Sequence, residues 1–288
     1  MGDWGVGLYQ DDTAADLRNT IGLLAKLPVN GERLLEILVE HHGEPVSLDD
    51  DGGPAFWLVV ADQFERRGIA CPSAIKRALA AIDTNADLRD LERRGAGPSD
   101  LKKRSKMLSA LGQRLRFPRP TRPRPKATTP PAFGVEVGEA FAFPTMNGRG
   151  FNPWARNWQQ TGFVPNGWGA MLVVARGRVF DWLPWCATSS LTVHPAHEPT
   201  LDDVVTAKLY AHAGANSDHR AMLCVPRQSH LQKMEMRSLG RLELDARAAA
   251  RVISREHSPE YAVCCGWSFR VTGWNPKYGS GVAVKKLL

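Results

Sequence analysis

The stretch FPRPTRPRPKATTPPA, residues Phe117 to Ala132, separates two parts of the sequence that differ in character. Its prolines exclude a helix interior and favour extended polyproline geometry, because each ring fixes φ and removes a backbone N–H donor. If free and extended, these 16 residues would span on the order of 50 Å. We therefore expect a tether at residues 117–132 that joins a domain at residues 1–116 to a domain at residues 133–288.

Positive charge is concentrated in this tether and just before it. The chain has a formal net charge of +7, but residues 1–101 carry −8, residues 102–126 carry +10 and the remainder carries +5. The arginines here therefore either dock on the acidic front domain or bind an external anion such as a nucleic-acid phosphate. The charge balance favours the front domain. The candidate arginines are Arg114, Arg116, Arg119, Arg122 and Arg124.

Length and composition indicate a globular protein of two domains. At 288 residues the chain exceeds the size at which one hydrophobic core usually stops growing, and 43% of its residues are hydrophobic. Residues 1–10 lack the basic cap and apolar run of an export signal, and no segment approaches the ~18 uninterrupted apolar residues of a membrane span. The five cysteines are irregularly spaced, unlike a disulfide framework. We therefore expect a cytoplasmic protein that does not enter a membrane.

The front half shows apolar residues at helical spacing, separated by short loops. Thr13 followed by Asp16 forms a capping-box pattern at the first helix, and Gly43 and Gly68 mark two helix ends. Lysines and arginines crowd the start of the last helix and oppose its macrodipole, so we expect an acidic partner nearby. These patterns predict an antiparallel helical bundle. Its helices are expected at residues 12–27, 32–42, 54–67, 72–82 and 99–115.

The back half changes to the patterns of strands. Residues 170–183 read as a hairpin with its turn at Arg176 and Gly177, and helices are expected after the caps Thr200 and Asp245. We therefore predict an α+β fold, in which an all-helical N-terminal bundle precedes a C-terminal antiparallel sheet or partly open barrel with two helices. The expected strands are residues 139–144, 170–175, 178–183, 221–225, 231–236, 261–271 and 281–286.

Three short motifs carry a resemblance to bacterial proteins. The start, Trp4-Gly5-Val6-Gly7 followed by an Asp11-Asp12 helix cap, resembles a family of uncharacterised bacterial domains. Residues 137–144 are similar to the first strand of β domains in immunity proteins of polymorphic-toxin systems. Residues 167–182 resemble a hairpin found in uncharacterised bacterial proteins. The resemblance implies a bacterial accessory or defence-associated protein, and it brings no catalytic residue with it.

Aromatic and basic residues supply the binding candidates. A cluster of tryptophans with arginines between them is suited to anchoring a protein interface or to stacking bases, and it equally suits the core of a small sheet. We favour a non-catalytic protein-interaction protein, with nucleic-acid binding through the tether and an arginine-striped helix as the alternative. The candidates are Trp154, Trp158, Trp168, Trp182, Trp185, Arg247, Arg251 and Arg255.

Catalytic and metal sites are less well supported by the sequence. A hydrolase or nuclease would have to assemble Asp181, Cys186, His194 and His197, and no family-type signature accompanies these residues. A zinc site drawing on Cys264 and Cys265 is disfavoured, because neighbouring residues of a strand point to opposite faces and Cys265 would lie on the apolar face. We therefore expect no metal and no cofactor.

Overall fold

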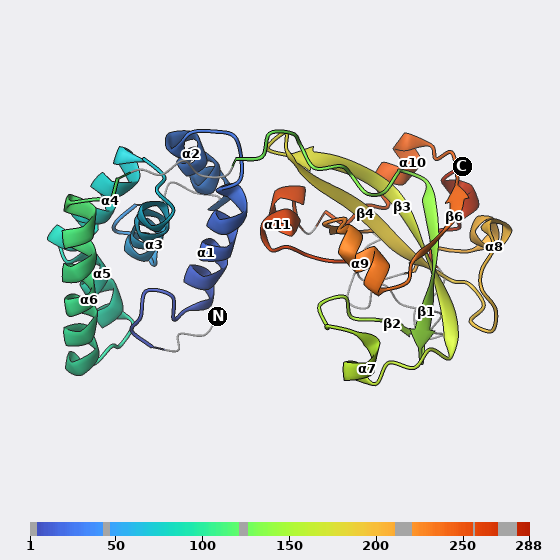
Figure 1. Cartoon of the computed structure of the whole chain (residues 1–288), viewed down its shortest axis with the longest axis horizontal. Coiled ribbons are helices and arrows are strands. Elements are labelled where there is room, and N and C mark those ends of the chain that lie inside the picture. Colours follow the sequence, from blue (N-terminus) through green and yellow to red (C-terminus); the bar gives the residue numbers. More distant parts are fainter. Residues whose placement is uncertain (1–4, 43–46, 121–125, 211–220, 256, 270–280) are drawn as a thin grey trace. The chain divides into compact units, whose positions relative to one another are not determined.

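A computed structural model of the chain describes residues 5–42, 47–120, 126–210, 221–255, 257–269 and 281–288. The chain divides into two units, Met1–Thr129 and Pro130–Leu288. The first is helical and the second holds the sheet, as Figure 1 shows, so the predicted α+β fold and two-part architecture are confirmed. In the part of the chain that the structure describes, no helix is both long and apolar enough to cross a bilayer.

The N-terminal unit is a bundle built around one buried helix. Almost every residue of α3 (Gly53–Arg66) is buried, and this helix contacts α1, α4, α5 and α6. The first helix is capped by Asp11, whose carboxylate accepts the Ala14 N–H, and not by Thr13. Helix α5 is not among the predicted helices, because it is short and strongly polar. The other bounds are α1 (Asp12–Leu24), α2 (Gly31–His42), α4 (Pro72–Asp83), α5 (Ala86–Arg93) and α6 (Pro98–Arg116).

A buried ion pair joins the start of α6 to α5. Arg104 and Asp87 are 3% and 1% exposed, and two bonds of 2.8 and 2.7 Å link the guanidinium to both carboxylate oxygens. Arg104 also donates to the Val6 carbonyl oxygen at 3.1 Å, which ties the N-terminal segment to the bundle. Asp87 thus provides the acidic partner expected at the basic start of α6.

We predict that R104M destabilises the helical unit by about 3–5 kcal/mol, because it leaves the Asp87 carboxylate buried without a counter-charge. The double variant R104M/D87L should recover most of this loss. Urea denaturation followed by far-UV circular dichroism measures both. Equal stabilities for the single and the double variant would contradict the prediction.

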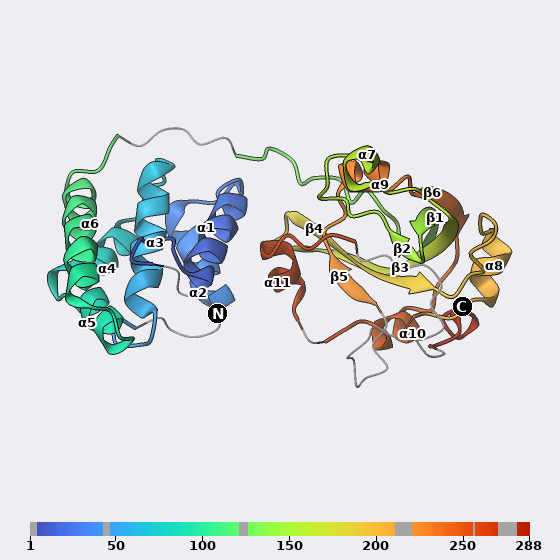
Figure 2. The ribbon, with the colours of Figure 1, turned by 90° about the horizontal axis from the view of Figure 1, so that it is seen from below.

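The C-terminal unit contains an antiparallel sheet that forms a half-barrel. Within it the strand order is β2-β1-β3-β4-β5, and β6 also pairs with β1. The long hairpin of β3 and β4 forms its centre (Figures 1 and 2). The strands are β1 (Glu139–Met146), β2 (Arg149–Gly150), β3 (Gly167–Val179), β4 (Leu183–Leu191), β5 (Met222–Cys224) and β6 (Arg237–Arg241).

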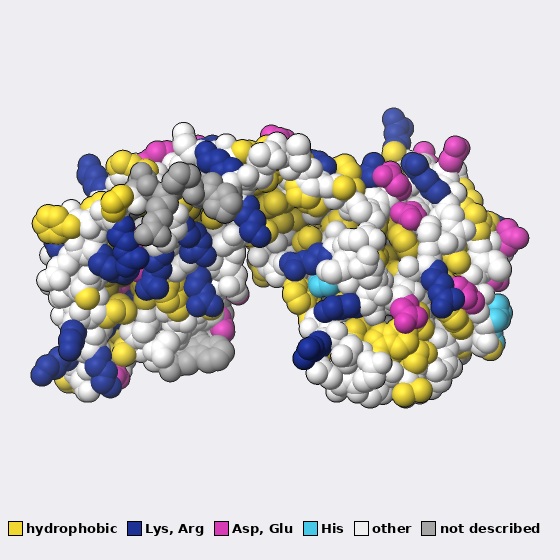
Figure 3. Space-filling model, in the orientation of Figure 1, with side chains coloured by type: hydrophobic (Ala, Val, Ile, Leu, Met, Phe, Trp, Pro, Cys, Tyr) yellow, Lys and Arg dark blue, Asp and Glu magenta, His cyan; other side chains and the backbone are white. Residues whose placement is uncertain are grey.

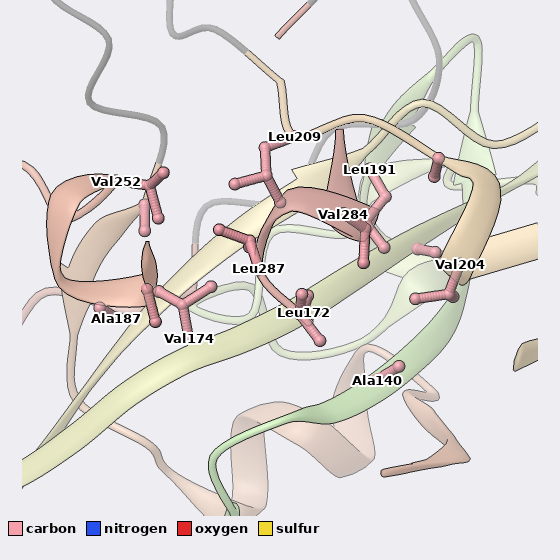
Figure 4. Packing of buried hydrophobic residues seen from close by; sticks show 14 of the residues in the cluster. Ala140, Leu172, Val174, Ala187, Leu191, Val204, Leu209, Val252, Val284 and Leu287 are labelled. Atoms are coloured by element: carbon pink, nitrogen blue, oxygen red, sulfur yellow. The ribbon is translucent and has the colours of Figure 1, made fainter. Parts of the chain in front are cut away.

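Both faces of this sheet are covered. On one face, shown in Figure 4, Leu172 and Val174 pack against Val204 of α8 (Leu201–Thr206), Val252 and Val284. On the other face, Phe143, Met171 and Val173 pack with residues of α9 (Gln228–Lys233) and of the loop before β3. Burial on both sides explains why residues 170–174 form an unbroken apolar run instead of alternating.

Short helices complete the two layers. Those predicted after Thr200 and Asp245 are present, and both caps hydrogen-bond as expected. The described residues also include three further short helices and one 3-10 turn. The predicted pair is α8 and α10 (Ala246–Arg251), and the further elements are α7 (Trp158–Thr161), α9, α11 (Pro259–Cys264) and η1 (Val284–Lys286).

Three predicted strands are wrong. Residues 231–236 overlap α9, in which Leu231 and Met234 face the core at helical spacing. Residues 261–271 overlap α11, which begins where Ser258 accepts the Tyr261 N–H, and residues 270–271 lie outside the described part of the chain. The third predicted strand, residues 281–286, is wrong because its last three residues form the 3-10 turn η1, Val284–Lys286. Six residues hold too little periodicity to distinguish a helix from a strand.

The predicted hairpin is present, but its turn is misplaced. Arg176 and Gly177 lie inside β3 opposite Cys186 and Trp185, and the chain turns at residues 180–181, where φ is +52° and +58°. Two positive φ values in succession are the pattern of a type I′ turn. Gly177 has another role, since an added Cβ would lie 2.7 Å from the Trp185 indole nitrogen. The glycine therefore admits an indole ring and does not form the turn.

Candidate functional site

The described arginines before and within the tether are paired with acidic side chains of their own unit. Arg114 pairs with Asp62 and with Glu65, Arg116 with Asp83, and the Nε of Arg119 lies 3.3 Å from Glu65. Arg122 and Arg124 lie outside the described residues. Further along, the Ala127 N–H donates to the Lys26 carbonyl oxygen at 2.9 Å. Three of the five candidate arginines are thus engaged with acidic side chains of the helical unit.

Asp62 is the centre of this network. It is 1% exposed and accepts hydrogen bonds from Tyr9 and Arg114. Burial opposes its ionisation, but these hydrogen bonds and the charges of Arg66 and Arg114 outweigh burial and lower the pKa of Asp62. The carboxylate therefore stays charged and holds the end of α6 against α3.

The candidate tryptophans divide by exposure. Trp158 packs against the core and donates its indole N–H to the Lys233 carbonyl oxygen at 2.9 Å, and Trp185 packs on the opposite face of the sheet. Trp168 and Trp182 are half-buried. Trp154 differs, because 57% of its surface is exposed. Of the predicted tryptophans, Trp154 is the one most available to a partner.

Trp154 stands at a pocket of about 480 Å³ in the C-terminal unit. One wall is residues 150–154, which follow β2, and the other is residues 265–269, which follow α11. Phe151 and Phe269 anchor the two walls in the same core cluster. We call this cavity the Trp154 pocket.

Two side chains from the start of α9 bridge the two walls. The guanidinium carbon of Arg227 lies 4.8 Å from the Trp154 ring centroid, and its Nη2 would lie 3.2 Å from a Cβ added at Gly266. The His230 ring lies 4.8 Å from the Trp154 ring, and its Nδ1 is 2.6 Å from Ser268 Oγ. A cation, an imidazole and a hydroxyl are thereby gathered beside an exposed indole.

Arg227 has no carboxylate partner among the described residues. Burial lowers the pKa of its guanidinium. The other described arginines stacked on rings of this unit are satisfied: Arg237 over Trp168 bonds Glu198 at 2.9 Å, and Arg176 and Arg178 over Phe133 bond Glu136 and the Trp182 carbonyl. A half-buried cation left without its own anion is suited to bind one from outside.

His230 is held in the neutral state. It is 5% exposed, and burial, followed by the nearby charges of Arg227 and Lys233, lowers the pKa of its imidazole. Among the described residues no carboxylate is hydrogen-bonded to His230, so the histidine–serine pair lacks the third group that orients a catalytic triad. The pair can position a hydroxyl for hydrogen bonding to a ligand.

The residues suggested for hydrolysis are not brought together. Asp181 is exposed at the turn that starts β4, whereas His194 and His197 are exposed beyond its far end. Cys186 is buried between them with its Sγ 3.4 Å from that of Cys224, and burial raises the pKa of its thiol. No group of three or more metal-ligand side chains occurs in the described ranges.

The expectation for Cys265 is wrong, because this residue ends a helix. Cys264 is buried and Cys265 is exposed beside the Trp154 pocket. A helix turns successive side chains by about 100°, so the strand alternation assumed for these residues does not apply.

The arginine stripe is shorter than predicted. Arg247 and Arg251 lie four residues apart on α10 and are exposed, but the helix ends at Arg251 and Arg255 lies beyond it. No ion pair involves Arg247 or Arg251 within the described part of the chain. They remain candidates for phosphate contact.

Comparison with family models, with curated proteins and with solved structures finds no match to this chain. Of the residues gathered at the pocket, Trp154 is a predicted binding residue, whereas Arg227, His230 and Ser268 are not among the predicted ones. No motif marks these three residues, which come together only because α9 packs between the two pocket walls.

We predict that His230 makes the C-terminal unit less stable as the pH falls. Its folded pKa lies below the unfolded value, so the unfolded chain binds more protons as the pH drops through about 6.5. The melting temperature of H230Q should therefore fall less than that of wild type when the pH is lowered from about 7.5 to about 5.5. Differential scanning calorimetry measures this, and equal losses would contradict the prediction.

Proposed function

We propose that this chain is a non-catalytic, cytoplasmic protein-interaction protein of bacteria, immunity-like or defence-associated, whose C-terminal unit binds a protein partner at the Trp154 pocket. The observation that carries the proposal is the placement of Trp154, which is 57% exposed and contacted by Arg227 and His230. The resemblance of residues 137–144 and 167–182 to bacterial proteins supports the partner class.

The physical argument rests on exposure combined with fixed geometry. Tryptophan and arginine dominate binding hot spots because they bury large surfaces around well-defined pockets. The contacts from α9 restrict the indole before a partner arrives, which reduces the entropy lost on binding. In the space-filling view, basic side chains lie beside exposed hydrophobic ones over the part of this unit where α7 and α9 are drawn (Figure 3).

The test is affinity capture from a bacterial lysate, followed by titration of the captured protein against variants. We predict that W154A weakens binding by about 30-fold, because loss of a hot-spot side chain costs about 2 kcal/mol or more. V164A is the control, since Val164 is 70% exposed in the same unit and lies outside the pocket walls. The proposal fails if no protein is recovered, or if W154A binds as tightly as V164A.

Nucleic-acid binding is a second candidate, favoured by the exposed Arg247 and Arg251. The described arginines before and within the tether, Arg114, Arg116 and Arg119, support it less than the sequence indicated, because each has an acidic partner in its own unit. On α10 the guanidinium groups are exposed, and Lys285 and Lys286 of η1 are exposed too. The Asp245 N–H at the cap of α10 bonds the Leu287 carbonyl oxygen at 2.6 Å, which joins α10 to the end of η1.

For this candidate we predict that R247Q/R251Q lowers the slope of log affinity against log salt by about 2, since each phosphate contact contributes about 0.9. Gel shifts on duplex DNA at several salt concentrations measure the slope. R116Q is the control, because Arg116 and its partner Asp83 are both exposed, and it should leave the slope unchanged. Undetectable binding of wild type at low salt would eliminate this function.

A further inference from the structure

The Trp154 pocket presents one cationic group whose donors lack acceptors in the described part of the chain. Arg227 has five N–H donors, its guanidinium lies over the Trp154 ring, and its Nη2 lies beside the space that a side chain at Gly266 would fill. An anion that replaces water at these donors forms charge-assisted hydrogen bonds, which are stronger than bonds between neutral groups. We propose that the Trp154 pocket binds a carboxylate group of the protein partner, with Arg227 as its cation; this inference rests on the proposed function.

The position of the guanidinium suits a ligand that enters the pocket. The Trp154 ring gives the guanidinium a cation–π contact, and an indole has no conventional acceptor for its N–H groups, so these donors stay available to a ligand. Gly266 has φ of +65° and no side chain, which lets Arg227 approach the second wall. Carboxylates bind the edge of an arginine with two parallel hydrogen bonds.

Ser268 supplies a further donor. It lines the pocket, and its Oγ lies 2.6 Å from Nδ1 of His230. When the neutral imidazole carries its proton on Nδ1, it donates to Oγ and leaves the serine hydroxyl proton for the ligand. One arginine and one hydroxyl then serve the two oxygens of a carboxylate.

The donor set favours a carboxylate over a phosphate. Among the described residues, Arg227 brings a fork of N–H donors to the pocket and Ser268 brings a hydroxyl, while burial, followed by the charges of Arg227 and Lys233, lowers the pKa of His230. The Nζ of Lys233 keeps its positive charge nearby but donates to the Pro153 and Ala155 carbonyl oxygens at 3.2 and 3.1 Å. A carboxylate presents two acceptor oxygens, which the guanidinium and the hydroxyl can serve, whereas a phosphate presents three.

The experiment titrates the full chain with small probes and follows the arginine Nε–H and tryptophan indole N–H signals by NMR. N-acetylglutamate amide carries a side-chain carboxylate, N-acetylglycine carries a terminal carboxylate, and N-acetylglutamine amide is the neutral control. We predict saturable shifts at Arg227 and Trp154 with a Kd of about 1 mM for an acidic probe and none for the neutral one. The tighter acidic probe identifies the source of the carboxylate.

Variants separate this inference from a general charge effect. R227Q should weaken the binding of the acidic probe by at least about tenfold. R237Q is the matched control, because Arg237 also stacks on a tryptophan but has Glu198 as its anion, and it should bind as wild type does. If R227Q is not folded by circular dichroism, R227K takes its place, since it keeps the charge but loses the paired donors.

Three results would overturn the inference: no saturable shift with either acidic probe, equal affinity in R227Q, or tighter binding of inorganic phosphate than of both carboxylates. Each is distinguishable from failure of the proposed function. If capture of a partner depends on Trp154, the proposed function holds even when all three results are found. If an acidic probe binds at Arg227 but no partner is captured, the proposed function fails and the carboxylate site is still supported.

Discussion

Burial of the central hairpin on both faces is the constraint from which the C-terminal unit is built. Residues 170–174 of β3 are all 1% exposed or less, so each face of the sheet requires its own covering layer. Alternate residues of a strand point to opposite faces, and one run of sequence therefore serves two cores. Leu172 and Val174 face one core and Met171 and Val173 the other. The short helices of this unit belong to these two covering layers.

The Trp154 pocket follows from the second layer. Leu231 and Met234 fix α9 in the core that contains Phe151 and Phe269, the anchors of the two pocket walls. With α9 in place, its first residues reach both walls. The Val225 N–H bonds the Trp267 carbonyl oxygen at 2.8 Å and aligns the wall at residues 265–269 with the chain that enters α9. Packing in the core of the sheet thus positions Arg227 and His230 at the pocket.

How far the sequence predicts this arrangement depends on the range of the interaction involved. The apolar run of β3, the apolar spacing of the N-terminal helices other than α5 and the cap at Thr200 are local patterns, and each predicted its element. Gly177 led to the wrong position for the hairpin turn, because the sequence does not distinguish a glycine that makes room for the Trp185 ring from a glycine in a turn. His230 and Ser268 are 38 residues apart, and no local pattern reports their contact.

Arg227 has no carboxylate partner in the described ranges, and it lies beside the buried imidazole of His230, whose pKa is lowered by burial and then by the charge of Arg227. The most direct test is an NMR titration of the His230 imidazole in wild type, R227Q and R237Q. Because burial and then the charge of Arg227 lower the pKa of His230, R227Q should move that pKa upward towards its ordinary value, while R237Q should leave it unchanged. An unchanged His230 pKa in R227Q would contradict the account.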